Sequence, residues 1–311
     1  MAPSLEAVGL SKKFGSFSAL TDLNLKLQGA KCVGFLGPNG AGKTTTMKIF
    51  TGLISASSGT ATINGVDVSK DKKGALASCT SLIETPEIYS SLTPKEALTM
   101  LCAIRGVPSS ERNKRIDEAI GRVKMTEWEN KKVGSFSKGM KQRINVASTL
   151  LSDPEVIILD EPTTGLDPRG MTEVREIVKS LDDRLVFMSS HLLGEVTEVC
   201  DEVAMIDHGK LLVYDSIGAV TSKFSGGGGN VDVGFSHPVD AQTISVVASV
   251  MGVLSVVPGS EQHLLLKFDP GTTTQEKLFE GLAAMRVGVT SLKETSSGLE
   301  DAYLSLIKET L

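Results

Sequence analysis

Residues 31–44 read Lys31-Cys-Val-Gly-Phe-Leu-Gly-Pro-Asn-Gly-Ala-Gly-Lys-Thr44, and this stretch decides the fold. The apolar run 31–36 predicts a buried strand, and a helix is expected from about Thr44 to Gly52. The loop between them fits the pattern G-x-x-x-x-G-K-[ST] of a phosphate-binding loop. Its glycines let successive backbone N–H groups turn around phosphate oxygens, and the following helix points its positive end at the same anion. The stretch therefore predicts an α/β fold that binds a nucleotide.

The spacing within this loop gives its residues roles. Lys43 is expected to bridge the terminal phosphates and to take part in catalysis, and the Thr44 hydroxyl is expected to bind Mg²⁺. The cofactors implied are therefore ATP and Mg²⁺. The other residues expected to contact the nucleotide are Gly37, Pro38, Asn39, Gly40, Ala41, Gly42 and Thr45.

A second apolar run supplies the acids that such a site needs. Residues Val156-Ile-Ile-Leu159 predict a parallel strand, and Asp160 and Glu161 follow at its end. Asp160 is expected to reach the Mg²⁺ shell through water. Glu161 is placed to polarise the attacking water as a general base. A strand ending in Asp-Glu is common, but beside a phosphate loop it predicts a catalytic pair.

Adenine rather than guanine is the predicted base. A guanine-specific protein would carry Asn-Lys-x-Asp, whereas the nearest match, Asn130-Lys-Lys-Val133, lacks the acid. Phe14, on a predicted first strand, is a candidate for stacking on the adenine ring. The alternative for this lone aromatic residue is a place in the core.

Length and composition bound the remaining possibilities. The chain has 311 residues, of which 41% are apolar and 22% charged, and its formal net charge is −5, so we expect about two folded domains and no nucleic-acid partner. The four cysteines show no Cys-x-x-Cys spacing, which argues against a zinc site and a disulfide scaffold. We expect neither a secretory signal nor a membrane span, since the longest later apolar run, 244–257, contains three serines.

A run of four glycines within 222–230 divides the chain, because consecutive glycines do not favour a helix or strand. We expect a nucleotide-binding domain over 1–222, a linker over 223–230 and an accessory domain over 231–311. The first is predicted as an α/β core with helical insertions at Pro94–Arg105 and Arg112–Met125. The second has a β-α-β-β-α-β order typical of a ferredoxin-like α+β unit, closed by a helix over Leu299–Glu309. Its predicted elements are Val231–Ser236, Asp240–Met251, Gly252–Val257, His263–Phe268, Thr274–Met285 and Val287–Glu294.

Three further motifs carry a family resemblance. Phe136-Ser-Lys-Gly-Met140 opens a predicted helix over Met140–Leu151, Thr164-Gly-Leu-Asp167 follows the acid pair, and His191 follows the apolar run that starts at Leu185. In this order they resemble the signature, D-loop and switch histidine of the ATP-binding cassette (ABC) ATPases, over roughly 4–220. The resemblance implies a P-loop ATPase with a helical subdomain.

It also implies a partner subunit and further site residues. In this family two subunits, identical or closely related, enclose two ATP molecules head to tail. Ser137 and the Gly139 N–H are then expected to contact the partner's ATP. His191 is expected to hold the γ-phosphate from the chain's own side, as a catalytic residue. Asp167 is expected to contact the partner and position Glu161.

The chain departs from the family pattern at three positions. Lys138 and Met140 replace glycine and glutamine of the signature, but Ser137 and Gly139 are kept. Glu84 occupies the Q-loop position, where the family has glutamine. A carboxylate there can still ligate Mg²⁺ or water and contact the nucleotide site, while adding negative charge beside a triphosphate.

The Glu84 segment, the signature region and the tail 296–304 are similar to drug, antibiotic and lantibiotic exporter ATPases. This implies an ATPase subunit on the cytoplasmic face of the membrane that drives a separate transmembrane permease. The alternative is a soluble ABC ATPase acting on ribosomes or another cytosolic partner, although the ribosome-acting proteins usually hold two cassettes. A third reading is an accessory domain that binds a ligand or partner and gates the ATPase. The tail's apolar helical face fits core packing, or else a dimer or regulatory contact: Leu299, Ala302, Tyr303, Leu306 and Ile307.

Overall fold

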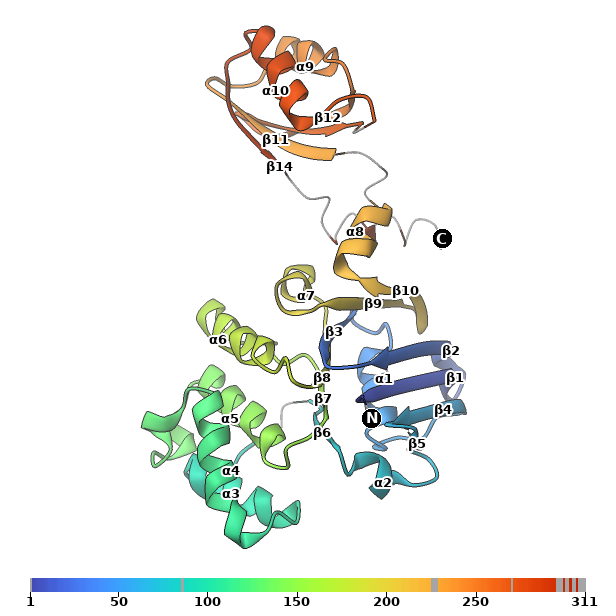
Figure 1. Cartoon of the computed structure of the whole chain (residues 1–311), viewed down its shortest axis with the longest axis vertical. Helices are drawn as coiled ribbons and strands as arrows, with labels where there is room; N and C mark the ends of the chain where they lie inside the picture. Colours follow the sequence, from blue (N-terminus) through green and yellow to red (C-terminus); the bar gives the residue numbers. More distant parts are fainter. Residues whose placement is uncertain are drawn as a thin grey trace. The chain divides into compact units, whose positions relative to one another are not determined.

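A computed structural model describes residues 2–84, 87–224, 229–269 and 271–294, together with 299, 302, 303 and 306. The chain divides into two compact units, Met1–Ser216 and Ile217–Leu311 (Figure 1). The contact boundary thus precedes the predicted linker. Among the residues described, none of the helices combines the length and apolarity needed to span a bilayer.

The core of the first unit is a six-stranded sheet. Its order is β10 (Lys210–Ser216), β9 (Glu202–Asp207), β3 (Lys31–Leu36), β8 (Leu185–Ser190), β7 (Val156–Leu159) and β6 (Cys79–Leu82). The neighbours from β9 to β6 are parallel, and β10 pairs antiparallel at one edge. All residues of β7 and β8 are buried, which explains their continuous apolar sequence. Parallel strands also place the residues after β3, β7 and β8 at one edge of the sheet.

A second, antiparallel sheet runs in the order β2 (Phe17–Gln28), β1 (Ser4–Phe14), β4 (Ser58–Ile63) and β5 (Val66–Asp67). One hydrophobic core joins this sheet to the parallel one, with Met47 and Phe50 of α1 (Lys43–Phe50) among its members. The short α2 (Lys72–Leu76) contributes Ala75 to the same core. Packing on both sheets therefore fixes the helix that follows the P-loop.

The predicted helical insertion is present as α3 (Pro94–Ile104), α4 (Ser109–Arg122) and α5 (Lys138–Leu150), shown in green in Figure 1. A capping box between Thr93 and Glu96 starts α3. Helix α5 begins earlier than predicted, because Ser137 caps it by accepting a hydrogen bond from the Met140 N–H. With α6 (Pro168–Lys179) and α7 (Leu193–Val199), these helices build a second core on the parallel sheet.

The second unit begins with α8 (Ile217–Phe224). Its further elements follow the predicted β-α-β-β-α-β order: β11 (Gly229–Phe235), α9 (Ala241–Ala248), β12 (Val253–Ser260), β13 (His263–Phe268), α10 (Gln275–Ala284) and β14 (Val289–Glu294). The strands form an antiparallel sheet in the order β12-β13-β11-β14. Leu299, Ala302, Tyr303 and Leu306 are helical, and the rest of the predicted closing helix lies outside the described residues.

Strand β11 starts inside the glycine run, within the stretch predicted to be linker. Gly229 pairs with Phe268, and a Cβ at Gly229 would lie 2.2 Å from the Phe268 ring. The absence of a side chain at Gly229 therefore leaves room for the Phe268 ring in its present position. Residues 225–228 of the predicted linker lie outside the described residues.

Candidate nucleotide site

The loop after β3 contains positive φ angles, which the glycines in its sequence predict. Gly40 and Gly42 have φ values of 85° and 108°, which favour glycine. A Cβ at Gly37 would lie 2.2 Å from the Ile206 carbonyl oxygen, so the close approach to β9 also requires glycine. Lys43 is 5% exposed, and its Nζ donates to the carbonyl oxygens of Gly37 (2.7 Å) and Pro38 (3.1 Å). The lysine is thus held against its own loop.

The structure brings together two of the three proposed Mg²⁺ ligands, Thr44 and Asp160. Thr44 Oγ1 donates to Asp160 Oδ1 at 3.2 Å, and Asp160 is buried. Ser189, at the end of β8, donates to the same carboxylate oxygen at 2.6 Å and also accepts from the Glu161 N–H. A hydroxyl beside a carboxylate is an oxygen donor set that fits Mg²⁺, which binds one or two carboxylates, water and substrate phosphates.

Glu161 is the centre of a charged cluster. Its Oε1 lies 3.3 Å from Lys43 Nζ, its Oε2 lies 2.8 Å from His191 Nδ1, and Thr164 Oγ1 donates to it at 2.7 Å. Burial acts to raise the pKa of the Glu161 carboxyl, but the Thr164 hydrogen bond and the neighbouring Lys43 and His191 outweigh burial and hold that pKa below its usual value. The carboxyl group is therefore ionised, and in this arrangement its two oxygens contact Lys43 and His191.

Two phenylalanines stand at the mouth of the loop. A cavity of about 230 Å³ is lined by Phe14 and Phe17 on one side and by the phosphate loop and Glu161 on the other. The Phe14 side chain is 50% exposed, so the alternative of a core residue is wrong. Lys12 Nζ lies 4.9 Å from its ring centre. The lining residues are Phe14, Phe17, Ala19, Asn39, Gly40, Gly42, Lys43, Thr44, Thr45 and Glu161.

Glu84, the third proposed Mg²⁺ ligand, forms an ion pair with a lysine of α1. Its side chain is 69% exposed and its Oε1 lies 2.5 Å from Nζ of Lys48, on α1. Lys48 therefore balances the charge that the carboxylate adds at the Q-loop position. The backbone φ of Glu84 is 58°, in the left-handed region.

We expect the Glu84→Gln variant to keep its ATPase activity within about fivefold of the wild type, because an exposed ion pair contributes at most about 1 kcal/mol. Steady-state phosphate release at saturating Mg·ATP measures this. Complete loss of activity would show that the carboxylate has a chemical role that the amide cannot replace.

The signature and D-loop residues stand at two helix starts. Ser137 caps α5, and Asp167 caps α6 by accepting from the Gly170 N–H at 3.1 Å. The two starts touch, since a Cβ at Gly139 would lie 3.3 Å from Gly170 Cα. In this chain Asp167 therefore bonds to its own helix, and Thr164 is the D-loop residue that contacts Glu161.

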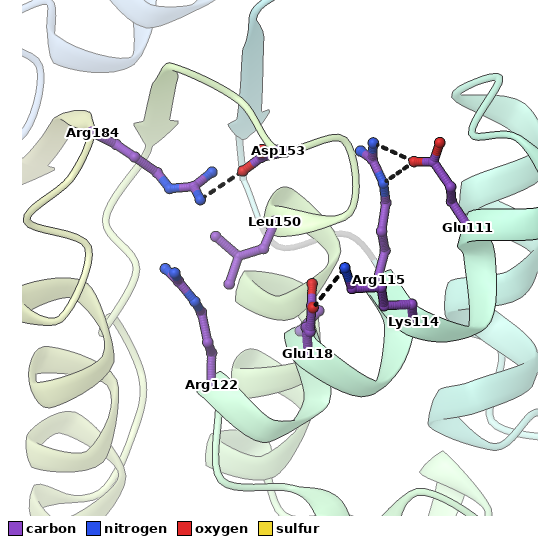
Figure 2. A pocket seen from close by; sticks show the side chains of 9 residues that line it. Glu111, Lys114, Arg115, Glu118, Arg122, Leu150, Asp153 and Arg184 are labelled. Carbon is purple, nitrogen blue, oxygen red and sulfur yellow. Dashed lines mark hydrogen bonds and ion pairs between the residues drawn. The ribbon is translucent and has the colours of Figure 1, made fainter.

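A second cavity, of about 270 Å³, lies beside α4 (Figure 2). Each of its four cations has an acidic partner, so little positive charge remains there for a triphosphate. The pairs and their N–O distances are Lys114–Glu118 (3.9 Å), Arg115–Glu111 (2.7 Å), Arg122–Asp183 (3.9 Å) and Arg184–Asp153 (2.8 Å). The predicted site residues all lie elsewhere.

Several site residues escaped sequence analysis. Ser189, Phe17 and Lys48 gave no signal of their own, because each acquires its contact from a distant element. Thr164 is part of the D-loop motif, but Asp167 is the residue of that motif to which the resemblance assigns a role.

A P-loop on a parallel sheet, with Thr44 beside Asp160 and Glu161 beside His191, defines a P-loop ATPase. Known proteins narrow this class. A family model described as ABC transporter matches residues 20–164. The bacitracin transport ATP-binding protein BcrA of Bacillus licheniformis is 40% identical over 215 residues, which cover 68% of this chain and 69% of BcrA.

Two further proteins match. The linearmycin resistance ATP-binding protein LnrL of Bacillus subtilis is 30% identical over 99% of both chains. The structure of cbiO1 from Clostridium perfringens, described as part of the transporter complex cbiONQ, matches with a TM-score of 0.62 and 25% identity, over 68% of this chain and 88% of cbiO1. The chain therefore belongs to the ABC transporter family, as an ATP-binding subunit with ATPase activity.

Proposed function

We propose that this chain drives a separate membrane permease that exports an antibiotic-like compound. The cluster of Lys43, Glu161 and His191 beside Thr44 and Asp160 is the observation that carries the ATP-hydrolysing part. The names of BcrA and LnrL, which record bacitracin transport and linearmycin resistance, support the export part. The permease chooses the compound, so its identity lies with that partner. The site of action is the cytoplasmic face of the membrane, with this chain attached through the permease.

The contacts of the site suggest how its residues act. When a triphosphate binds, Lys43 exchanges its contacts with the Gly37 and Pro38 carbonyl oxygens and with Glu161 for contacts with phosphate oxygens. The exchange is favourable because charge-assisted hydrogen bonds to phosphate are stronger. Glu161, freed from this pair, accepts the proton of the attacking water, and His191 holds the γ-phosphate. Thr44 and Asp160 would hold Mg²⁺, which would offset charge on the phosphates when bound. The remaining loop residues supply backbone N–H groups, except Pro38, which as a proline has none and shapes the loop instead.

The site is completed by a second subunit, either identical or closely related. Ser137 is exposed at the start of α5. Gly139, close to it, packs closely on Gly170 of α6, so the start of α5 lies beside the start of α6, which Asp167 caps. A helix start without acidic residues in its first turn suits an anion brought by another molecule. We assign Ser137 and the Gly139 N–H to the partner's ATP, and Asp167 to the contact between subunits.

The second unit is assigned as a ferredoxin-like accessory domain. Its β-α-β-β-α-β order and the sheet order β12-β13-β11-β14 support this assignment. We keep 1–222 as the nucleotide-binding domain, 223–230 as the linker and 231–311 as the accessory domain. The division of the chain into two compact units supports two domains, and it assigns α8 to the second unit.

Stacking of adenine on Phe14 gives a direct prediction. Phe14→Ala should weaken Mg·ATP binding about 5–30-fold, since stacking a base on an aromatic ring contributes about 1–2 kcal/mol. Thermal stability should change little, because the ring is half exposed. A fluorescent ATP analogue measures the affinity, and Phe17→Ala is the matched comparison. If Phe17→Ala has the larger effect, Phe17 is the stacking residue instead.

A pull-down tests the transporter assignment. The Glu161→Gln variant is incubated with Mg·ATP, to hold the dimer closed, and used to capture partners from detergent-solubilised membranes. A stoichiometric polytopic membrane protein is the expected result. Capture of ribosomes, or a dimer without any membrane partner, would overturn the assignment and leave the ATPase chemistry standing.

A further inference from the structure

Helix α7 carries a buried acid that the proposed reaction does not use. Glu195 is 1% exposed and lies in the first turn of the helix. Thr163 Oγ1 donates to its Oε1 and Ser190 Oγ donates to its Oε2, both at 2.5 Å. A carboxyl group is costly to bury unless its oxygens are hydrogen-bonded. Here each carboxylate oxygen accepts a hydrogen bond from one hydroxyl group, so both oxygens of Glu195 are fixed in place.

The two hydroxyls belong to the two segments that carry the proposed catalytic residues. Thr163 lies between Glu161 and Thr164, and Thr164 Oγ1 donates to Glu161. Ser190 directly precedes His191, whose Nδ1 lies 2.8 Å from Glu161 Oε2. Glu195 therefore closes a ring that runs from Glu161 through Thr163, Glu195 and Ser190 to His191 and back to Glu161.

A cation from a third element faces this ring. Arg175, on α6, places Nε 3.8 Å from Glu195 Oε1, and that nitrogen is buried without a hydrogen-bond partner. Its Nη1 lies 2.9 Å from Oε2 of Glu198, one turn further along α7. Arg175 thus holds α7 against α6, the helix that Asp167 caps. Glu198 shares this arginine but is about half exposed and bonds to neither catalytic segment.

We propose that Glu195 is a positioning residue for ATP hydrolysis, which fixes the distance between Glu161 and His191 by holding Thr163 and Ser190. The proposal rests on the roles given above to Glu161 and His191. Glu195 contacts the two segments and not the phosphate loop. Its loss should therefore slow the chemical step, since displacing a reacting group by about 1 Å can reduce the rate about 100-fold. Binding of nucleotide should be unaffected.

The test compares Glu195→Ala with Glu198→Ala. The second variant removes an acid that lies on the same helix and pairs with the same arginine, Arg175. Hydrogen exchange of the nucleotide-free proteins is measured for segments 160–167, 188–194 and 31–50. The turnover kcat and the Kd for Mg·ATP are measured alongside. If Glu195→Ala does not fold, the two hydroxyls are removed singly by Thr163→Val and Ser190→Ala. Glu195→Gln keeps one oxygen acceptor and should restore part of the turnover.

The expected result is faster exchange in 160–167 and 188–194 only, with kcat lowered about 10–100-fold and Kd within about twofold, in Glu195→Ala but not in Glu198→Ala. Unchanged exchange in the two segments, or an unchanged kcat, would overturn the proposal. So would equal loosening of 31–50 with a weaker Kd, because that marks a role in folding alone. If wild type and Glu198→Ala also fail to hydrolyse ATP, the proposed function fails, and the exchange data still decide whether Glu195 holds the two segments.

Discussion

The Glu161→Gln variant should lose at least about 99% of its ATPase turnover, because a positioned general base contributes about 10²–10⁴-fold to the rate. The amide keeps the shape and can still contact Thr164 and His191, but it cannot accept the proton of the attacking water. It also removes the negative charge that pairs with Lys43. Affinity for Mg·ATP should therefore be unchanged or tighter, and ATP should accumulate in a closed dimer.

Single-turnover hydrolysis and a binding titration measure the two effects separately. Glu176→Gln is the control, since this acid on α6 pairs with Lys124 and lies outside the nucleotide site. Turnover within about tenfold of wild type would mean that another group, with His191 the first candidate, activates the water.

The second large effect is expected from Lys43→Met, which keeps the apolar stem and removes the charge. A charge-assisted hydrogen bond to phosphate contributes about 1.5–3 kcal/mol, so Kd for Mg·ATP should rise about 10–100-fold. The variant should still fold, although the Gly37 and Pro38 carbonyl oxygens and Glu161 lose their donor. Isothermal titration with a non-hydrolysable analogue gives the affinity.

Lys73→Met provides the control, because it removes an exposed positive charge from α2 in the same unit. Binding should be unchanged in this variant. A Kd for Lys43→Met equal to that of the control would contradict the assignment of Lys43 to the phosphates.

How far the sequence predicts this structure depends on the kind of element. Strands β3 and β13 have the predicted bounds, since their apolar residues and the loops after them are explicit in the sequence. Thr44 could be expected to meet Asp160 because parallel strands end at one edge of a sheet. Helix α5 starts two residues before the predicted Met140, because the Ser137 side chain caps the helix in addition to its expected contact with phosphate.

Contacts between distant elements are what the sequence did not predict. Glu84 meets Lys48 because a turn after β6 brings it over α1, and no local pattern records that turn. The roles of Glu195 and Ser189 are likewise visible only when α7, β7 and β8 are placed together. Local patterns predict how an element begins and ends, whereas these partnerships come from tertiary packing.

Glu84 and Glu161 share a feature that bears on evolution as well as chemistry. Each follows the end of one of two adjacent parallel strands, at the level where Leu82 pairs with Leu159, and each has a positive φ, 58° and 46°. A residue with a Cβ loses roughly 1 kcal/mol or more in this region, and glycine would not. Against a total folding stability of about 5–15 kcal/mol, the two acids are a measurable burden. Selection for heat resistance alone should therefore favour glycine at position 84. At position 161, glycine would also remove the contacts to Lys43, His191 and Thr164 and the proposed general base, so there the strained backbone is kept for activity.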